Sequence, residues 1–279
     1  MTVLTWGVGV ALAVFRSFLG ILATVAWCSL ALLARPLWRR SVIALQPYWA
    51  RTVLACAGVK VRVNAAAAAP PAPVVYVSNH QSGLDILVMI AWMPDSVRFV
   101  AKKEMASAPF TGWFMRAADY IFIDRANSER AKQSLREAAA QLRHGGRSVI
   151  IFPEGHRHPP GTLGPFKMGA IHLAMEAGVP VVPVGITNSG VLMERKSLIS
   201  RSGSVDINIG PPLDPTRYVG REKQLRDLLR VAVKHLAGDA AALDADDVLE
   251  QAAARLTPAA RTPTAGMRLN THKDPAPHG

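Results

Sequence analysis

The first 63 residues are dominated by apolar positions. Residues 3–15 are apolar and end at Arg16, and residues 17–34 then carry no charge before the basic cluster of Arg35, Arg39 and Arg40. At about 1.5 Å per residue, this uncharged run covers roughly 27 Å as a helix, close to the hydrocarbon thickness of a bilayer. The pattern predicts a helical membrane anchor. It is either one spanning helix or a helical pair in one leaflet, with residues 41–58 as the second helix.

After residue 73, short apolar runs alternate with helical patterns. A helix is predicted to begin near Asn127 and Ser128 and to end at Gly145 and Gly146, and another runs from about residue 166 to 177. This alternation predicts an α/β fold with a central, largely parallel sheet flanked by helices. The predicted strands are residues 74–77, 97–101, 120–123, 148–152, 179–186 and 205–209.

These patterns divide the chain into four parts. Residues 1–63 form the helical membrane-anchoring segment, and residues 64–73, rich in Ala and Pro, form a linker. Residues 74–251 form the α/β domain. Residues 252–279 are rich in Ala, Pro, Thr and Gly without periodicity, which predicts a disordered tail.

Charge is distributed unevenly along the chain. The formal net charge is +12, and residues 1–84 carry seven basic side chains and no acidic one, so the remainder carries only +5. An apolar, purely cationic N-terminal third favours an anionic membrane surface as partner and not nucleic acid. Cys28 and Cys56 lie in apolar surroundings without CxxC or metal-type spacing, which predicts two buried thiols.

Candidate chemistry follows two of the predicted strands. His80 and Asp85 come directly after the run at residues 74–77, and a second polar loop, residues 153–158, follows the run that ends at Phe152. Side chains in loops at strand ends meet at one edge of a sheet, where small-molecule sites are commonly found. An imidazole beside a carboxylate is suited to act as a general base, although a buried His–Asp pair can also be purely structural.

Four motifs in this order make the chain resemble the glycerophospholipid acyltransferase family, and most closely its bacterial 1-acyl-sn-glycerol-3-phosphate acyltransferases. The resemblance covers roughly residues 35–215. His156, His158 and Met168 depart from the residues common in the family at their positions. The motifs are Asn-His-x4-Asp at residues 79–85, Phe-Ile-Asp-Arg at 122–125, Phe-Pro-Glu-Gly-x-Arg at 152–157 and Val-Pro-x-x-Pro-Val at 179–184.

The resemblance implies transfer of a fatty acyl group from acyl-CoA or acyl carrier protein to the sn-2 hydroxyl of lysophosphatidate, giving phosphatidate. His80 is then the catalytic base and Asp85 orients it, while backbone N–H groups of a helix beginning near residues 83–85 are candidate oxyanion donors. No cofactor beyond the acyl donor and no metal is expected. The residues expected to bind substrate are Lys102, Arg125, Glu154, Gly155, Arg157 and Lys167.

Several alternatives remain open at this stage. Another lyso-lipid, such as lyso-ornithine lipid, is a second acceptor. An acyl ester or thioester hydrolase and a non-enzymatic lipid-binding protein are alternatives of other classes. No Gly-x-Ser-x-Gly sequence is present, so direct attack by the acceptor hydroxyl is simpler than a covalent acyl-enzyme. The expected location is the bacterial inner (cytoplasmic) membrane, with the catalytic domain facing the cytoplasm.

Overall fold

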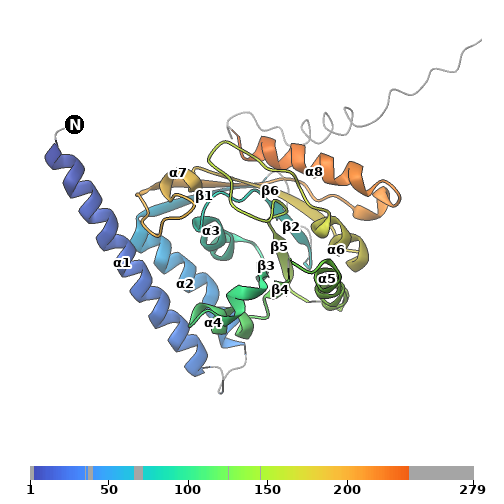
Figure 1. Ribbon diagram of the computed structural model, residues 1–279, viewed down its shortest axis with the longest axis horizontal. Helices are drawn as coiled ribbons and strands as arrows, with labels where there is room; N and C mark the ends of the chain where they lie inside the picture. Colours follow the sequence, from blue (N-terminus) through green and yellow to red (C-terminus); the bar gives the residue numbers. More distant parts are fainter. Residues whose placement is uncertain are drawn as a thin grey trace, which may run out of the picture.

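The computed structural model describes residues 3–34, 36, 40–65, 72–124, 126–144 and 146–238, and its centre is a seven-stranded sheet (Figure 1). The strand order is β1-β7-β6-β2-β5-β3-β4. All neighbouring strands are parallel except β6 and β7, so β1 and β7 run against the other five. The strands are β1 (Val59–Ala65), β2 (Val75–Ser78), β3 (Val97–Lys102), β4 (Ile121–Ile123), β5 (Ser148–Ile151), β6 (Val181–Thr187) and β7 (Gly203–Ile209).

Helices cover both faces of this sheet, because its central strands are apolar on both sides. On one face, α3 (Leu84–Trp92) joins the N-terminal helices over a core that includes Tyr76 and Ile150. On the other face, α5 (Ser128–Arg143), α6 (Gly169–Ala177) and α8 (Glu222–Leu236) cover Val75 and Val149. Successive strand residues thus alternate between two cores. The remaining elements are η1 (Lys103–Ser107), α4 (Thr111–Ala117), α7 (Ser189–Leu192) and η2 (Pro215–Tyr218).

The N-terminal helices form a pair beside the sheet. α1 (Val3–Ala34) and α2 (Ser41–Ala57) are held together by hydrogen bonds from the Ser41 hydroxyl to Ala31 O (3.1 Å) and from Trp49 Nε1 to the Thr24 hydroxyl (3.2 Å). Within α1, the stretch Gly7–Ala34 contains an 18-residue window with a mean hydropathy of 2.0, of which only 6% is buried, so the stretch is long and apolar enough to cross a membrane.

The predicted α/β fold with a largely parallel sheet is confirmed, and each predicted strand corresponds to one of β2–β7 within one or two residues at its ends. Of the two predicted capping residues of helix α5, Asn127 is the cap, since its side chain accepts a hydrogen bond from Arg130 N, whereas Ser128 is the first residue of the helix. Helix α6 starts at Gly169 instead of residue 166, because Lys167 N–H is bonded to Pro153 O and residue 166 lies in the preceding loop.

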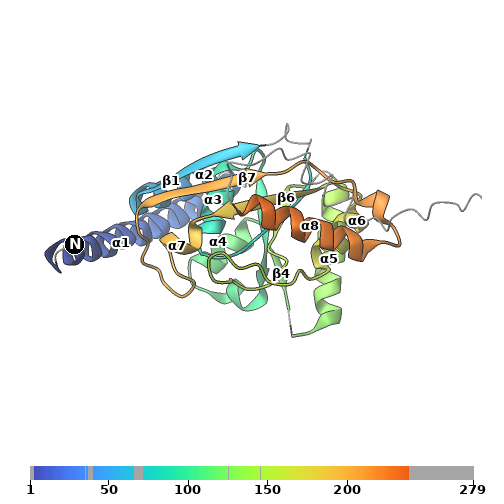
Figure 2. The same cartoon turned by 90° about the horizontal axis from the view of Figure 1, so that it is seen from above.

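One feature of the N-terminal part differs from the prediction. Residues 59–65 form β1, which pairs in register with β7 at the sheet edge (Figure 2), so the sheet begins before the predicted anchor boundary at residue 63. Helix α1 continues through Arg16 without a break. Its guanidinium lies 3.3 Å from the position that a Cβ on Gly58 would occupy, so the charge faces the protein and the helix needs no interruption. The predicted tail and most of the linker lie outside the described residues.

Candidate active site

The loop after β2 carries the His–Asp pair and is fixed by its first residue. The Asn79 amide donates to Ile186 O (2.9 Å) and accepts from Ile186 N (2.8 Å), which ties the loop to the end of β6. Asn79 is buried, so these two bonds replace the water it would otherwise bind. The loop therefore has a fixed position at the carboxyl edge of the parallel strands.

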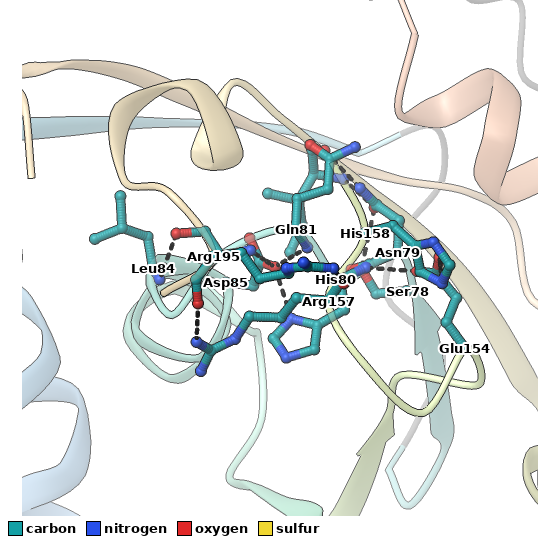
Figure 3. A network of polar contacts seen from close by, with 12 residues as sticks. Ser78, Asn79, His80, Gln81, Leu84, Asp85, Glu154, Arg157, His158 and Arg195 are labelled. Atoms are coloured by element: carbon teal, nitrogen blue, oxygen red, sulfur yellow. Dashed lines mark hydrogen bonds and ion pairs between the residues drawn. The ribbon is translucent and has the colours of Figure 1, made fainter. Parts of the chain in front are cut away.

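Asp85 holds His80 in one orientation. Its Oδ2 lies 2.8 Å from His80 Nδ1 and also accepts hydrogen bonds from the backbone N–H groups of Gln81 (2.7 Å) and Ser82 (2.9 Å) (Figure 3). The aspartate is fully buried in the first turn of α3, where the helix dipole favours a negative charge. With Nδ1 directed at a carboxylate, Nε2 is the ring nitrogen placed to accept a proton from a substrate.

Aromatic packing fixes the imidazole plane as well. The Phe152 ring stacks on His80 with centroids 4.1 Å apart and planes 13° apart, and Phe99 packs behind Phe152 at 6.0 Å. The His80 side chain is 12% exposed, so it is sheltered but still reachable. A histidine held by a carboxylate on one side and an aromatic face on the other loses little further freedom when it reacts.

The Glu154 carboxylate points into the protein, whereas a residue that binds substrate was expected to face the substrate. Its side chain is fully buried, and its two oxygens accept hydrogen bonds from His80 N (2.8 Å) and Gly164 N (2.7 Å). His158 Nε2 approaches the same carboxylate at 3.4 Å without hydrogen-bond geometry. Both oxygens therefore face protein groups and not a space for glycerol hydroxyls. Glu154 joins the two loops that the sequence placed at the sheet edge.

Arg157 and Lys167 lie beside this centre. Arg157 Nη2 is 3.8 Å from the position of a Cβ on Gly83, and Lys167 Nζ is 3.0 Å from the position of a Cβ on Gly155. Gly155 has φ +80, a conformation that favours glycine, and the close ammonium adds a second reason for its small size. The structure thus brings a guanidinium and an ammonium to the two loops that meet at His80.

The other predicted site residues are less closely associated. Lys102 ends β3 at the same sheet edge, but its ammonium pairs with Glu104 at 3.3 Å and is 54% exposed. Arg125 lies outside the described residues. Of the candidate oxyanion donors, Leu84 N–H is bonded to the Ser82 hydroxyl at 3.2 Å. Throughout the described residues, no three His, Cys, Asp or Glu side chains cluster closely enough to share a metal ion.

Sequence reasoning missed Arg195. Arg157 Nη1 donates to Arg195 O (2.9 Å), and Arg195 Nη1 donates to Arg157 O (3.2 Å), so the two residues hold each other across 38 positions of sequence (Figure 3). Arg195 lies outside the four motifs, and its position in an ordinary basic loop gave no signal. Phe152 was visible as a motif residue, but its stacking on His80 was not predictable from spacing.

Known proteins are similar to this chain in sequence and in fold. Residues 60–187 match the sequence profile of the family described as Acyltransferase. The chain is 38% identical over 157 residues to human 1-acyl-sn-glycerol-3-phosphate acyltransferase alpha, covering 56% of each protein. It is 34% identical over 143 residues to the Saccharomyces cerevisiae 1-acyl-sn-glycerol-3-phosphate acyltransferase, covering 50% of this chain and 47% of the yeast protein. The chain thus spans about half the length of these curated relatives.

The fold is also known from a solved structure. The 1-acyl-sn-glycerophosphate acyltransferase PlsC of Thermotoga maritima superposes with a TM-score of 0.69 at 24% identity, covering 84% of this chain and 98% of that one. His80, Asp85, Glu154 and Arg157 all lie within the segment that matches the family. Within residues 60–187 this chain is therefore similar to the acyltransferase family, and the solved structure shows the same fold.

Proposed function

We propose that the protein is a membrane-attached 1-acyl-sn-glycerol-3-phosphate acyltransferase of the bacterial type. It moves a fatty acyl group from acyl-CoA or acyl carrier protein to the sn-2 hydroxyl of lysophosphatidate. The observation that carries this proposal is the His80–Asp85 pair at 2.8 Å, held at the carboxyl edge of the sheet with Arg157 beside it. The names of the relatives support the same substrate class.

The geometry supports a direct transfer. His80 Nε2 takes the proton of the acceptor hydroxyl while the hydroxyl oxygen attacks the thioester carbonyl carbon. Asp85 stabilises the imidazolium that forms. The buried carboxylate is itself stabilised by three hydrogen-bond donors, which are His80 Nδ1 and the backbone N–H groups of Gln81 and Ser82. The tetrahedral intermediate then expels the thiolate, which receives the proton from His80. The products are the new ester and the free thiol, so no covalent acyl-enzyme is required.

Cationic groups around His80 supply the recognition of a phosphate. Arg157 can bind a phosphate through two parallel N–H donors, and Lys167 adds a point charge. Lys102 and Arg125 stay proposed contributors on the strength of the family resemblance alone. Glu154 acts in this proposal by fixing the backbone of His80 and not by touching the acceptor.

The membrane attachment follows from α1 and α2. An apolar helix with little buried surface, in an N-terminal third without a single acidic side chain, suits an anionic bilayer. Lipid acceptor and lipid product both reside in the leaflet, so an anchored enzyme need not extract them fully. We place the protein at the bacterial inner membrane with its α/β domain on the cytoplasmic side, because basic residues cluster directly after α1.

The deciding experiment measures thiol release from oleoyl-CoA by the purified protein with and without lysophosphatidate, for the wild type and His80→Ala. Thiol release that requires lysophosphatidate and falls by about 10²–10⁴-fold in His80→Ala supports acyl transfer with His80 as the general base. Release without acceptor points to a thioesterase. If CoA donors fail, acyl carrier protein and lyso-ornithine lipid are tested in the same way, and silence with all of them refutes the proposal.

A further inference from the structure

The loop between α7 and β7, residues 193–200, exposes two neighbouring apolar side chains. Leu198 is 75% exposed and Ile199 is 46% exposed. Ser197 fixes their turn, because its hydroxyl accepts from Ile199 N (2.9 Å) and donates to Ile199 O (3.2 Å). A local turn that holds adjacent large apolar residues outward indicates contact with an apolar environment.

This loop lies against the membrane helix. Ser200 N donates to the Ser17 hydroxyl at 3.2 Å, in the middle of α1, and Figure 1 shows the segment beside α7 reaching that helix. The outer face of α1 is itself exposed and apolar, for example at Phe15 (57%) and Phe18 (55%). The apolar tip of the loop therefore adjoins the exposed apolar face of α1, and a bilayer that covers the helix also reaches the loop.

The other end of the same loop is attached to the candidate active site. The Ser82 hydroxyl donates to Met193 O at 2.9 Å, and Arg195 exchanges guanidinium-to-carbonyl hydrogen bonds with Arg157. Each cross-bond uses one of the five N–H donors of a guanidinium. Among the described residues neither guanidinium makes an ion pair, so both cations of this cross-bonded pair lack an acidic partner. Such a pair is suited to a doubly charged anion, because guanidinium groups bind phosphate oxygens with several N–H donors at once.

We propose that the 193–200 loop docks on an anionic bilayer through Leu198 and Ile199, and that Arg195 joins Arg157 in binding the phosphate monoester of the acceptor lipid. The loop thereby aligns the headgroup of a lipid still in the leaflet with His80. The identity of the acceptor rests on the proposed function, whereas docking and phosphate binding are measurable without turnover.

Docking is tested with an environment-sensitive dye on the full chain. Cys28 and Cys56 are replaced by Ala, and a single cysteine is introduced by Leu198→Cys or, as control, Val219→Cys. Val219 is 72% exposed and lies between η2 and α8, and α8 lies across the molecule from α1 (Figure 1). When vesicles containing phosphatidylglycerol are added, the emission of the dye at position 198 shifts to shorter wavelength and is quenched by brominated lipid. The emission of the dye at position 219 does not change. Equal behaviour at the two positions, in either direction, would overturn the docking.

The role of Arg195 is tested by equilibrium binding of 1-hexanoyl-glycerol-3-phosphate and of 1-hexanoyl-glycerol, which lacks the phosphate. Arg195→Ala weakens binding of the phosphate compound by about 10- to 100-fold and leaves the phosphate-free compound unchanged. Arg195→Lys restores part of the loss, and Lys196→Ala, which removes a charge one position along, changes binding less than about twofold.

The inference about Arg195 is wrong if Lys196→Ala costs as much as Arg195→Ala, or if both compounds lose affinity equally. A wild-type chain that binds the phosphate compound through Arg195 but transfers no acyl group would refute the proposed function and leave the phosphate site standing. If the Arg195→Ala variant transfers acyl groups with an unchanged KM for lysophosphatidate, the role of Arg195 is refuted and the proposed function stands.

Discussion

Replacing Glu154 by Gln tests whether this residue supports the site or binds substrate. In the structure each carboxylate oxygen accepts one backbone hydrogen bond, from His80 N at 2.8 Å and from Gly164 N at 2.7 Å. A glutamine keeps the shape but offers one acceptor oxygen and one NH₂ group. One of the two backbone N–H groups then faces another donor in a fully buried position.

The expected cost follows from these contacts. Losing one charge-assisted hydrogen bond and leaving a buried N–H unpaired lowers the free energy of unfolding by about 2–4 kcal/mol. For a folded unit of this size that corresponds to a fall in Tm of roughly 5–12 °C. Because the His80 loop is still held by Asn79 and Asp85, we expect a lower kcat and little change in KM for the acceptor.

The assay combines thermal unfolding with steady-state kinetics on Glu154→Gln and on a control, Glu176→Gln, which changes an exposed glutamate on α6. The control should match the wild type in both measurements. A Glu154→Gln protein with unchanged Tm and a strongly raised acceptor KM would refute the supporting role and restore the direct substrate contact predicted from the sequence.

Three further predictions concern other parts of the molecule. Asp85→Asn removes the charge that stabilises the imidazolium, so kcat should fall by about 10²–10⁴ with little change in KM in the thiol-release assay; an unchanged kcat would contradict the base assignment. Burial, with a smaller contribution from Asp95, raises the pKa of Tyr76 above its usual value of 10.0, so the folded state keeps the phenol neutral while the unfolded chain ionises. Its stabilisation is complete below pH 10.0 and declines above it; urea midpoints should fall more steeply with alkaline pH in the wild type than in Tyr76→Phe, and parallel curves would refute this. Gly164→Ala would drive a methyl group into the His158 ring, so the Tm of this variant should fall below that of the wild type. In the control Gly161→Ala a Cβ meets no atom within 4 Å and φ is +75, so this variant measures backbone strain alone; an unchanged Tm for Gly164→Ala would contradict the close packing of His158.

The sequence by itself determined the features that depend on local pattern. Apolar runs of four to eight residues specified β2–β7. The five-residue spacing from His80 to Asp85 lets the histidine in the loop before α3 meet the aspartate in the first turn of that helix. Strand β1 was also readable in principle, because Val59, Val61 and Val63 alternate with Lys60 and Arg62. Its proximity to the apolar helices obscured that short signal.

Only the tertiary structure decided which distant segments meet. Residues 62 and 206 pair because β1 and β7 lie side by side, and Arg195 meets Arg157 because α7 follows β6 across the same sheet edge as the loop after β5. Glu154 lies in the same loop as Arg157, three residues before it. The turn at residues 153–155 nevertheless directs the Glu154 carboxylate inward, where it accepts hydrogen bonds from His80 N and Gly164 N. Periodicity encodes which face of an element is buried, whereas the partner on that face depends on strand order, which no local pattern contains.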